Sequence, residues 1–207
     1  MNTGNLEFDT GEPSGYFVLK GFCGKLGAYS LSSIRMEDSE CIRKWRNEQI
    51  TALRQKKPLS EKEQTKYFNE IVKFQFLQEQ PDQILLRFTL ENELIGYGGL
   101  VHLNWEDKRA EVSFLLESER TKDLALYERE CKVFMNLLKT CAFTVLGLNK
   151  ISTEAYSHRE FHVNALESAG FAREGVLREH VQIDGIWVDS VLASCLKSEY
   201  LEGLGEE

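Results

Sequence analysis

The loop 117–123 joins two segments of different periodicity and carries charges that suit an anion. Residues 109–116 alternate apolar and polar side chains, as a half-buried β-strand does. From Leu124 onward, apolar residues recur three and four apart, which predicts an amphipathic helix. The first N–H groups of a helix lack partners within it, so together with Arg120 and Lys122 they would attract a phosphate. The alternative is an ordinary strand–helix corner with solvated charges, which the lack of glycine in the loop favours.

The composition is that of one globular domain in a reducing compartment. The chain has 207 residues, of which 42% are hydrophobic and 28% charged. Its net charge of −8 argues against a nucleic-acid partner, and no apolar run is long enough to span a membrane. The N-terminus lacks the order of a signal peptide, and the five scattered cysteines have no metal-site spacing. We therefore expect a cytoplasmic protein that binds no nucleic acid, membrane or metal.

The order of segments predicts an α/β (α+β) fold with a mixed central sheet of about six to seven strands and helices on both faces. A helical crossover between 109–116 and 150–156 makes those two strands parallel. We expect the main domain over residues 29–202, preceded by an extension over residues 1–28 with a loose arm and a short strand at 16–23. The other expected elements are strands at 29–35, 84–90, 94–103, 176–183 and 186–196, a helix beginning at Asp38 or Ser39, a helix with a capping box of Ser60 and Glu63, a helix ended by Gly170, and a type I′ turn at Asp184-Gly185.

Three motifs resemble the GNAT acyltransferase superfamily, whose members use acyl-coenzyme A. The first is Trp45-Arg46-Asn47, and the second is the segment 92–99 running into 111–116. The third and most specific is the run 165–178, with Gly170-Phe171 and Glu174-Gly175, followed by Asp184-Gly185 and Asp189. This run is typical of the branch that contains ribosomal-protein N-terminal and amino-sugar acetyltransferases. Trp-Arg-Asn followed by Pro-Leu-Ser-Glu looks most like the sugar-nucleotide enzymes of the pseudaminic acid pathway. The likeness covers roughly residues 29–200.

The resemblance implies acetyl-coenzyme A as co-substrate and no metal. In this family two parallel strands splay apart and the thioester arm lies between them, which here would be strands 109–116 and 150–156. The diphosphate would lie on the loop before the helix that begins at Leu124. The implied donor contacts are Phe114, Leu115, Leu116, Arg120, Thr121, Lys122, Asp123, Leu124, Ala125, Arg159 and His162.

Three positions depart from the family pattern. Asp123 stands where the phosphate loop usually has its first glycine, and an aspartate adds bulk and a charge that phosphate repels. Arg159 stands near the usual asparagine, and Leu166 at the position of a frequent general-acid tyrosine. We therefore expect coenzyme A binding to be weakened, shifted or lost, and the acid to come from elsewhere or the thiolate to leave without one.

Acyl transfer to an amine needs a group that accepts a proton, and the departing sulfur benefits from one that donates. Glu111 is the candidate acceptor, Tyr156 the candidate donor, and His158 a candidate shuttle near neutral pH. The competing interpretations are a solvated strand carboxylate, a packed strand tyrosine and a surface histidine.

Trp45, Arg46 and Asn47 are the candidates for the acceptor pocket. Arg46 would hold a phosphate of a nucleotide-linked sugar, because a guanidinium binds phosphate with two parallel hydrogen bonds. The alternative is that Trp45 belongs to the core and Arg46 pairs with a nearby carboxylate.

The sequence favours an N-acetyltransferase acting on a small-molecule amine, preferably an amino sugar or nucleotide-linked amino sugar. A protein N-terminus of the ribosomal-protein type is the second acceptor, which the acidic surface would suit. A GNAT-fold binding module without catalysis is the alternative of a different class, favoured by Asp123 and Leu166. A homodimer is compatible with each interpretation.

Overall fold

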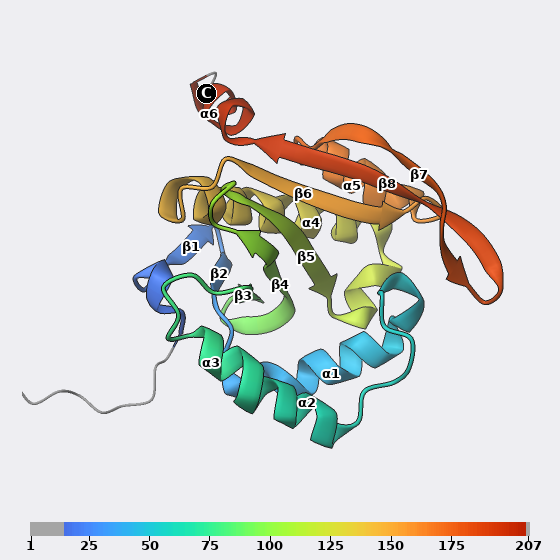
Figure 1. Cartoon of the computed structure of the whole chain (residues 1–207), viewed down its shortest axis with the longest axis horizontal. Coiled ribbons are helices and arrows are strands. Elements are labelled where there is room, and N and C mark those ends of the chain that lie inside the picture. Colours follow the sequence, from blue (N-terminus) through green and yellow to red (C-terminus); the bar gives the residue numbers. More distant parts are fainter. Residues whose placement is uncertain (1–14, 206–207) are drawn as a thin grey trace, which may run out of the picture.

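The structure, a computed structural model, describes residues 15–205, so the loose arm predicted for residues 1–15 lies outside the described residues apart from Gly15. Figure 1 shows the arrangement of the elements. The strands are β1 (Cys23–Leu26), β2 (Tyr29–Ser33), β3 (Ile84–Leu90), β4 (Glu93–Asn104), β5 (Arg109–Leu116), β6 (Lys150–Tyr156), β7 (Ala172–Ile183) and β8 (Ile186–Leu196). The helices are α1 (Ser39–Glu48), α2 (Glu61–Tyr67), α3 (Lys73–Gln75), α4 (Leu124–Lys139), α5 (Glu160–Ser168) and α6 (Lys197–Gly205).

All eight strands form one sheet in the order β1-β2-β3-β4-β5-β6-β8-β7. Only the central pair β5 and β6 is parallel, and every other neighbouring pair is antiparallel. The predicted mixed sheet with helices is confirmed, with one strand more than the six to seven expected. The parallel pairing follows from the α4 crossover, because a chain that crosses over the sheet re-enters it in the same direction.

The prediction of a strand at residues 16–23 is wrong. Residues Phe17–Leu19 form a 3₁₀ turn instead, and the edge strand β1 follows it. Tyr16 and Leu19 are both buried. Because these residues are three apart, a helical turn points both side chains into the core, whereas a strand would point them to opposite faces. The Tyr16 hydroxyl accepts a hydrogen bond from the Leu85 N–H at 2.9 Å and ties this turn to the start of β3.

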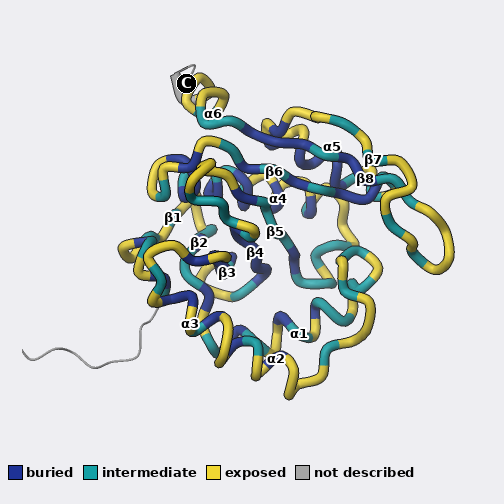
Figure 2. Tube along the Cα trace, in the orientation of Figure 1, coloured by how far each residue is buried: buried dark blue, intermediate teal, exposed yellow. Residues whose placement is uncertain are grey.

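The long helix packs on the sheet along the predicted stripe. Its middle positions are fully or nearly fully buried, while Leu124 and Val145 at the two ends are exposed. The last turns, Thr140–Val145, widen into a π-helix. Figure 2 shows buried positions along the central strands and within α4. The buried members of the stripe are Tyr127, Cys131, Phe134, Leu138 and Cys141.

Local sequence motifs correctly predicted the start of α2 and the β7–β8 turn, but not the residue that caps α1. Ser60 and Glu63 form the capping box at the start of α2, and Asp184 and Gly185 both have positive φ at the β7–β8 turn. The side chain of Asp38 does not cap α1; it accepts from the Arg35 N–H and pairs with Arg87. No helix within residues 15–205 is long and apolar enough to cross a membrane.

Two glycines of β4 allow its neighbours to approach. A Cβ on Gly98 would lie 2.1 Å from the Ser113 carbonyl oxygen of β5, and one on Gly99 would lie 2.0 Å from the Ile84 carbonyl oxygen of β3. Gly99 also has a φ of +135°, a backbone conformation that residues other than glycine rarely adopt. These glycines therefore let the backbones of the neighbouring strands approach β4 closely, and the contact at Gly98 fixes the backbone of β5 beside the cleft described below.

We predict that Gly98→Ala destabilises the protein, because the Ser113 carbonyl oxygen belongs to the paired backbone of β5 and cannot move away from the added methyl group. The expected loss is about 2 kcal/mol of unfolding free energy, typical of a strained close contact. Urea unfolding at neutral pH measures it. Gly175→Ala is the matched control, since a Cβ there meets nothing within 4 Å. Equal stability of the two variants would show that Gly98 is not required for the close approach of β4 and β5.

Candidate active site

The sheet opens between its two parallel strands. β5 and β6 pair only at Arg109–Lys150, Ala110–Ile151 and Glu111–Ser152. Beyond these residues β5 stays paired with β4, as far as Leu116, and β6 stays paired with β8, as far as Tyr156. Because each strand follows its outer neighbour, the inner edges separate and leave a cleft of about 330 Å³. Its lining includes Glu111, Val112, Ser113 and Phe114 from β5, Thr153, Glu154, Ala155 and Tyr156 from β6, and Arg46, Arg54, Gln55, Arg159, His162 and Leu166 from the surrounding elements.

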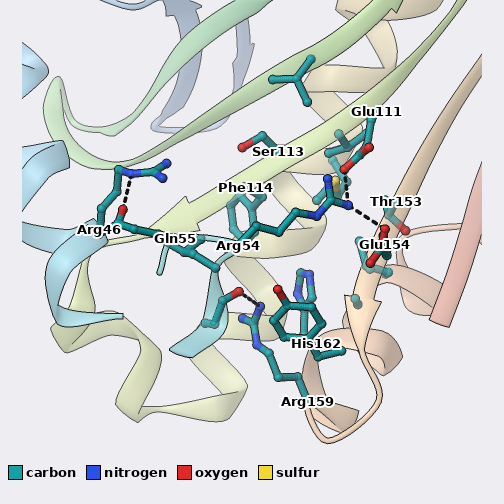
Figure 3. A pocket seen from close by; sticks show the side chains of 18 residues that line it. Arg46, Arg54, Gln55, Glu111, Ser113, Phe114, Thr153, Glu154, Arg159 and His162 are labelled. Atoms are coloured by element: carbon teal, nitrogen blue, oxygen red, sulfur yellow. Dashed lines mark hydrogen bonds and ion pairs between the residues drawn. The ribbon is translucent and has the colours of Figure 1, made fainter. Parts of the chain in front are cut away.

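A guanidinium joins the two sides of this opening. Nη2 of Arg54 lies 2.8 Å from an oxygen of Glu111 and 2.7 Å from an oxygen of Glu154, as Figure 3 shows. The second oxygen of Glu154 accepts from the Ser190 hydroxyl at 2.8 Å and lies 3.7 Å from Nε2 of His180. Two carboxylates from different strands therefore converge on one cation at the point where the strands part.

Of these three residues, sequence reasoning identified only Glu111. Glu154 had a signal of the same kind, because it is a carboxylate within an apolar strand and lies on the same strand face as Ser152, the partner of Glu111. Arg54 had no such signal, since it lies in a polar loop with no periodicity and its partners are far away in the sequence.

The three residues predicted for the acceptor pocket have different environments. Trp45 is buried in the core and is 5% exposed. Asn47 ties the loop after α1 to its own helix, because its side chain exchanges hydrogen bonds with the backbone of Leu59 and accepts from Gln55. Arg46 lines the cleft and donates to the Tyr97 hydroxyl at 2.8 Å and to Gln55 at 3.0 Å. Only Arg46 of the three therefore faces the cleft.

Tyr156 lines the cleft, whereas His158 is exposed and outside its lining. The two rings stack with centroids 6.0 Å apart. Burial raises the pKa of Tyr156, an effect that the nearby Arg54 opposes. Tyr156 consequently keeps its proton at neutral pH and can donate it to a group in the cleft.

His162 belongs to a buried hydrogen-bonded chain at the inner end of the cleft. Its Nδ1 lies 2.8 Å from the Tyr127 hydroxyl, which in turn is 3.4 Å from the Arg159 guanidinium. Burial, assisted by the positive charge of Arg159, lowers the pKa of His162 to about 3. Burial also raises the pKa of the Tyr127 hydroxyl, so that group keeps its proton and shares a hydrogen bond with Nδ1 of a neutral imidazole. His162 is therefore uncharged at physiological pH.

The neutral state of His162 makes the protein sensitive to acid. An unfolded histidine takes up a proton near pH 6.5, but the folded protein resists protonation until about pH 3. Stability is thus fully present above pH 6.5 and falls with decreasing pH, by up to about 1.4 kcal/mol per pH unit. We expect His162→Gln to lose about 2 kcal/mol less than the wild type between pH 7 and pH 5. Urea unfolding at the two pH values tests this, and parallel losses would contradict it.

The phosphate loop predicted before α4 is closed by its own aspartate. Asp123 caps the helix by accepting from the N–H groups of Ala125 at 3.0 Å and Leu126 at 3.1 Å. These are the groups that an anion at the helix start would use. The aspartate thus has a physical role beyond the charge repulsion expected from the sequence, because its carboxylate lies where a phosphate oxygen would bind.

The cations of this loop are also paired within the chain. Arg120 donates to Glu130, a carboxylate with no exposed surface, which also accepts from the Tyr29 hydroxyl. Lys122 pairs with Glu119 at the surface. The Thr121 hydroxyl donates to the Ser118 carbonyl, so Arg120, Thr121 and Lys122 all have partners within the chain.

The three strand residues predicted as donor contacts lie just before this loop. Phe114 lines the cleft, while the side chains of Leu115 and Leu116 are buried in the core. Any contact of Leu115 and Leu116 with a ligand would therefore be through the backbone. The separated edges of β5 and β6 fit an extended thioester arm, whereas the loop fits a diphosphate only if the Asp123 cap opens.

A sheet that opens between two parallel strands, with a helix N-terminus beyond the opening, is the arrangement that the resemblance to acyltransferases using acyl-coenzyme A predicts. The chain belongs to the GNAT acetyltransferase family: the model of the acetyltransferase (GNAT) domain matches residues 31–192. It is thus an N-acetyltransferase with acetyl-coenzyme A as co-substrate, and the predicted family is confirmed.

A curated protein and several solved structures are similar to this chain at low sequence identity. The N-acetyltransferase p20 of Bacillus licheniformis is 23% identical over 172 residues, which cover 83% of this chain and 94% of that protein. A spermidine N-acetyltransferase of Vibrio cholerae, in complex with coenzyme A and spermine, is 20% identical with a TM-score of 0.74, covering 85% of this chain and 99% of the other. A dodecameric structure of the Vibrio enzyme is 23% identical with a TM-score of 0.71, and the match covers 86% of this chain and 99% of that one.

Proposed function

We propose that the protein transfers an acetyl group from acetyl-coenzyme A to a primary aliphatic amine held beside Glu111. The separation of β5 from β6 directly after Glu111 supports this best, because it places a carboxylate at the apex of the opening that would hold the thioester. Val112, Ser113 and Phe114 on one side and the segment 153–156 on the other would line the arm.

Each side chain has a role that follows from its position. The donor supplies an acetyl thioester, in which the carbon–sulfur bond breaks as the amine nitrogen bonds to the carbonyl carbon. Glu111 takes the proton that the bound ammonium must lose before its nitrogen can attack, directly or through a water molecule. The second proton, lost as the amide forms, returns to the phenolate that is left when Tyr156 protonates the sulfur. Tyr156 gives its proton to the departing sulfur, which replaces the tyrosine absent at Leu166. Leu166 itself is buried against the cleft and adds apolar wall.

Cationic aliphatic amines are our first acceptor class and amino sugars the second. The paired carboxylates Glu111 and Glu154 favour an ammonium group. The Vibrio spermidine acetyltransferase, which has the same fold, acts on such a polycation. A nucleotide-linked sugar would need cations for its phosphates, and the arginines that line the cleft, Arg46, Arg54 and Arg159, all have partners within the chain. The resemblance of the Trp-Arg-Asn motif still supports an amino sugar.

A panel of acceptors tests the proposal. The purified protein is incubated with acetyl-coenzyme A and, in turn, with spermidine, 1,3-diaminopropane, glucosamine, a nucleotide-linked amino sugar and a peptide with a free N-terminus. Release of free thiol is followed, and the acetylated product is identified by mass spectrometry. We expect the highest kcat/KM with the diamine or polyamine. Faster turnover of the sugar or the peptide would overturn the order, and no amine-dependent thiol release would overturn the function.

A further inference from the structure

We propose that Arg54 is an internal stand-in for the acceptor: its guanidinium fills a subsite, formed by Glu111 and Glu154, that binds the ammonium group of a cationic substrate. This inference rests on the proposed function and names the substrate class of the same site. The acceptor enters by displacing Arg54 from the two carboxylates. The loop 50–57 that carries Arg54 would move with it.

The geometry is that of a cation site filled from within the chain. One guanidinium nitrogen contacts both carboxylates, at 2.8 Å and 2.7 Å. Glu111 and Glu154 are held in place from other elements, by strand pairing and by the Ser190 hydroxyl. The two glutamate side chains are 26% and 15% exposed, against 51% for Arg54, so the cation is the member of the group that can most easily return to water.

Charge decides what can replace Arg54. Two carboxylates drawn together from neighbouring strands repel one another, and burial adds to the cost of leaving them without a counter-ion. A neutral or anionic acceptor that displaced Arg54 would leave this repulsion uncompensated. An ammonium ion restores the pairing and places its nitrogen beside Glu111, which is the proposed proton acceptor.

The surroundings provide a route for the rest of the acceptor. A groove of about 690 Å³ runs between the loop that carries Arg54 and the β7–β8 hairpin, and it shares Leu53, Arg54, Gln55 and Tyr156 with the cleft. Arg54 thus lies where the two spaces meet. An elongated amine in this groove would bring its terminal nitrogen to the position that the guanidinium now takes.

The first test measures binding of methylguanidinium, a probe that mimics the Arg54 head group, without acetyl-coenzyme A. We expect Arg54→Ala to bind it in NMR titration at least ten times more tightly than the wild type. The double variant Arg54→Ala/Glu154→Gln should lose that binding. Equal binding by wild type and Arg54→Ala, or binding by neither, would overturn the proposal and make Arg54 a structural clamp.

Lys57→Ala is the matched control, because Lys57 lies in the same segment and pairs with Glu63 away from the cleft. It should bind the probe as the wild type does. Arg54→Gln is measured in parallel and should behave as Arg54→Ala does. If melting shows that both Arg54 variants are unfolded under conditions where Lys57→Ala is folded, Arg54 is a structural clamp and the proposal fails.

The second test follows turnover of 1,3-diaminopropane. Arg54→Ala should lower its KM by about tenfold with kcat within about twofold of the wild type, since an internal competitor has been removed. A raised KM would overturn the proposal. If no variant acetylates any amine while Arg54→Ala still binds methylguanidinium, the proposed function fails and the cation subsite stands.

Discussion

Glu111→Gln is expected to lower kcat for the preferred amine by about a hundredfold or more, with little change in the affinity for acetyl-coenzyme A. A positioned proton acceptor typically contributes a factor of this size. Glutamine has nearly the same shape but cannot take the proton that the attacking amine must release. Initial rates of thiol release at saturating acetyl-coenzyme A measure kcat, and calorimetric titration measures donor affinity.

Glu154→Gln is the matched comparison for this prediction. Glu154 contacts Arg54 as closely as Glu111 does, but it lies further along the widening opening. We expect its replacement to act mainly on the KM of cationic amines, because it removes attraction for the ammonium and not the proton acceptor. Equal losses of kcat in the two variants would argue that neither carboxylate acts alone. An active Glu111→Gln enzyme would remove Glu111 from the chemistry.

Asp123→Gly is expected to tighten acetyl-coenzyme A binding by about tenfold, equivalent to about 1.4 kcal/mol. The substitution frees the N–H groups of Ala125 and Leu126 and removes a negative charge from the place where the diphosphate would lie. Glycine at a helix N-cap costs only a few tenths of a kcal/mol, so the fold should be nearly unaffected. Calorimetric titration of the two proteins gives the ratio of dissociation constants.

Asp123→Asn separates the two causes of this effect. Asparagine caps a helix as well as aspartate does but carries no charge. We expect an intermediate affinity for acetyl-coenzyme A, and a difference from the wild type that shrinks at high salt. A dissociation constant unchanged in Asp123→Gly would show that the diphosphate does not use the start of α4.

Elements with strong local periodicity could be placed from the sequence. β5 and β6 begin and end at the predicted residues, because alternation marks both strands and a helical stripe lies between them. α6 was missed, since its inward contacts are few: the Tyr200 ring packs on Phe143 and its hydroxyl lies 3.1 Å from the hydroxyl of Thr140. A helix with so little buried surface leaves no apolar stripe to detect.

The site was harder to predict than the fold because its contacts join distant parts of the chain. Glu111 and Asp123 stood out within their own segments. The contacts of Arg54 with Glu111 and Glu154 depend on the loop after α1 reaching the opened sheet, which no local pattern encodes. Trp45 shows the opposite case, since a conspicuous motif residue is a core residue here.

The most direct test of the account is a calorimetric titration of the wild-type protein with acetyl-coenzyme A. The opening between β5 and β6 predicts one molecule bound per chain, with a micromolar dissociation constant despite the Asp123 cap. Absence of binding at millimolar acetyl-coenzyme A would contradict the account, because the opened strands would then have no donor to hold and Glu111 no reaction to serve.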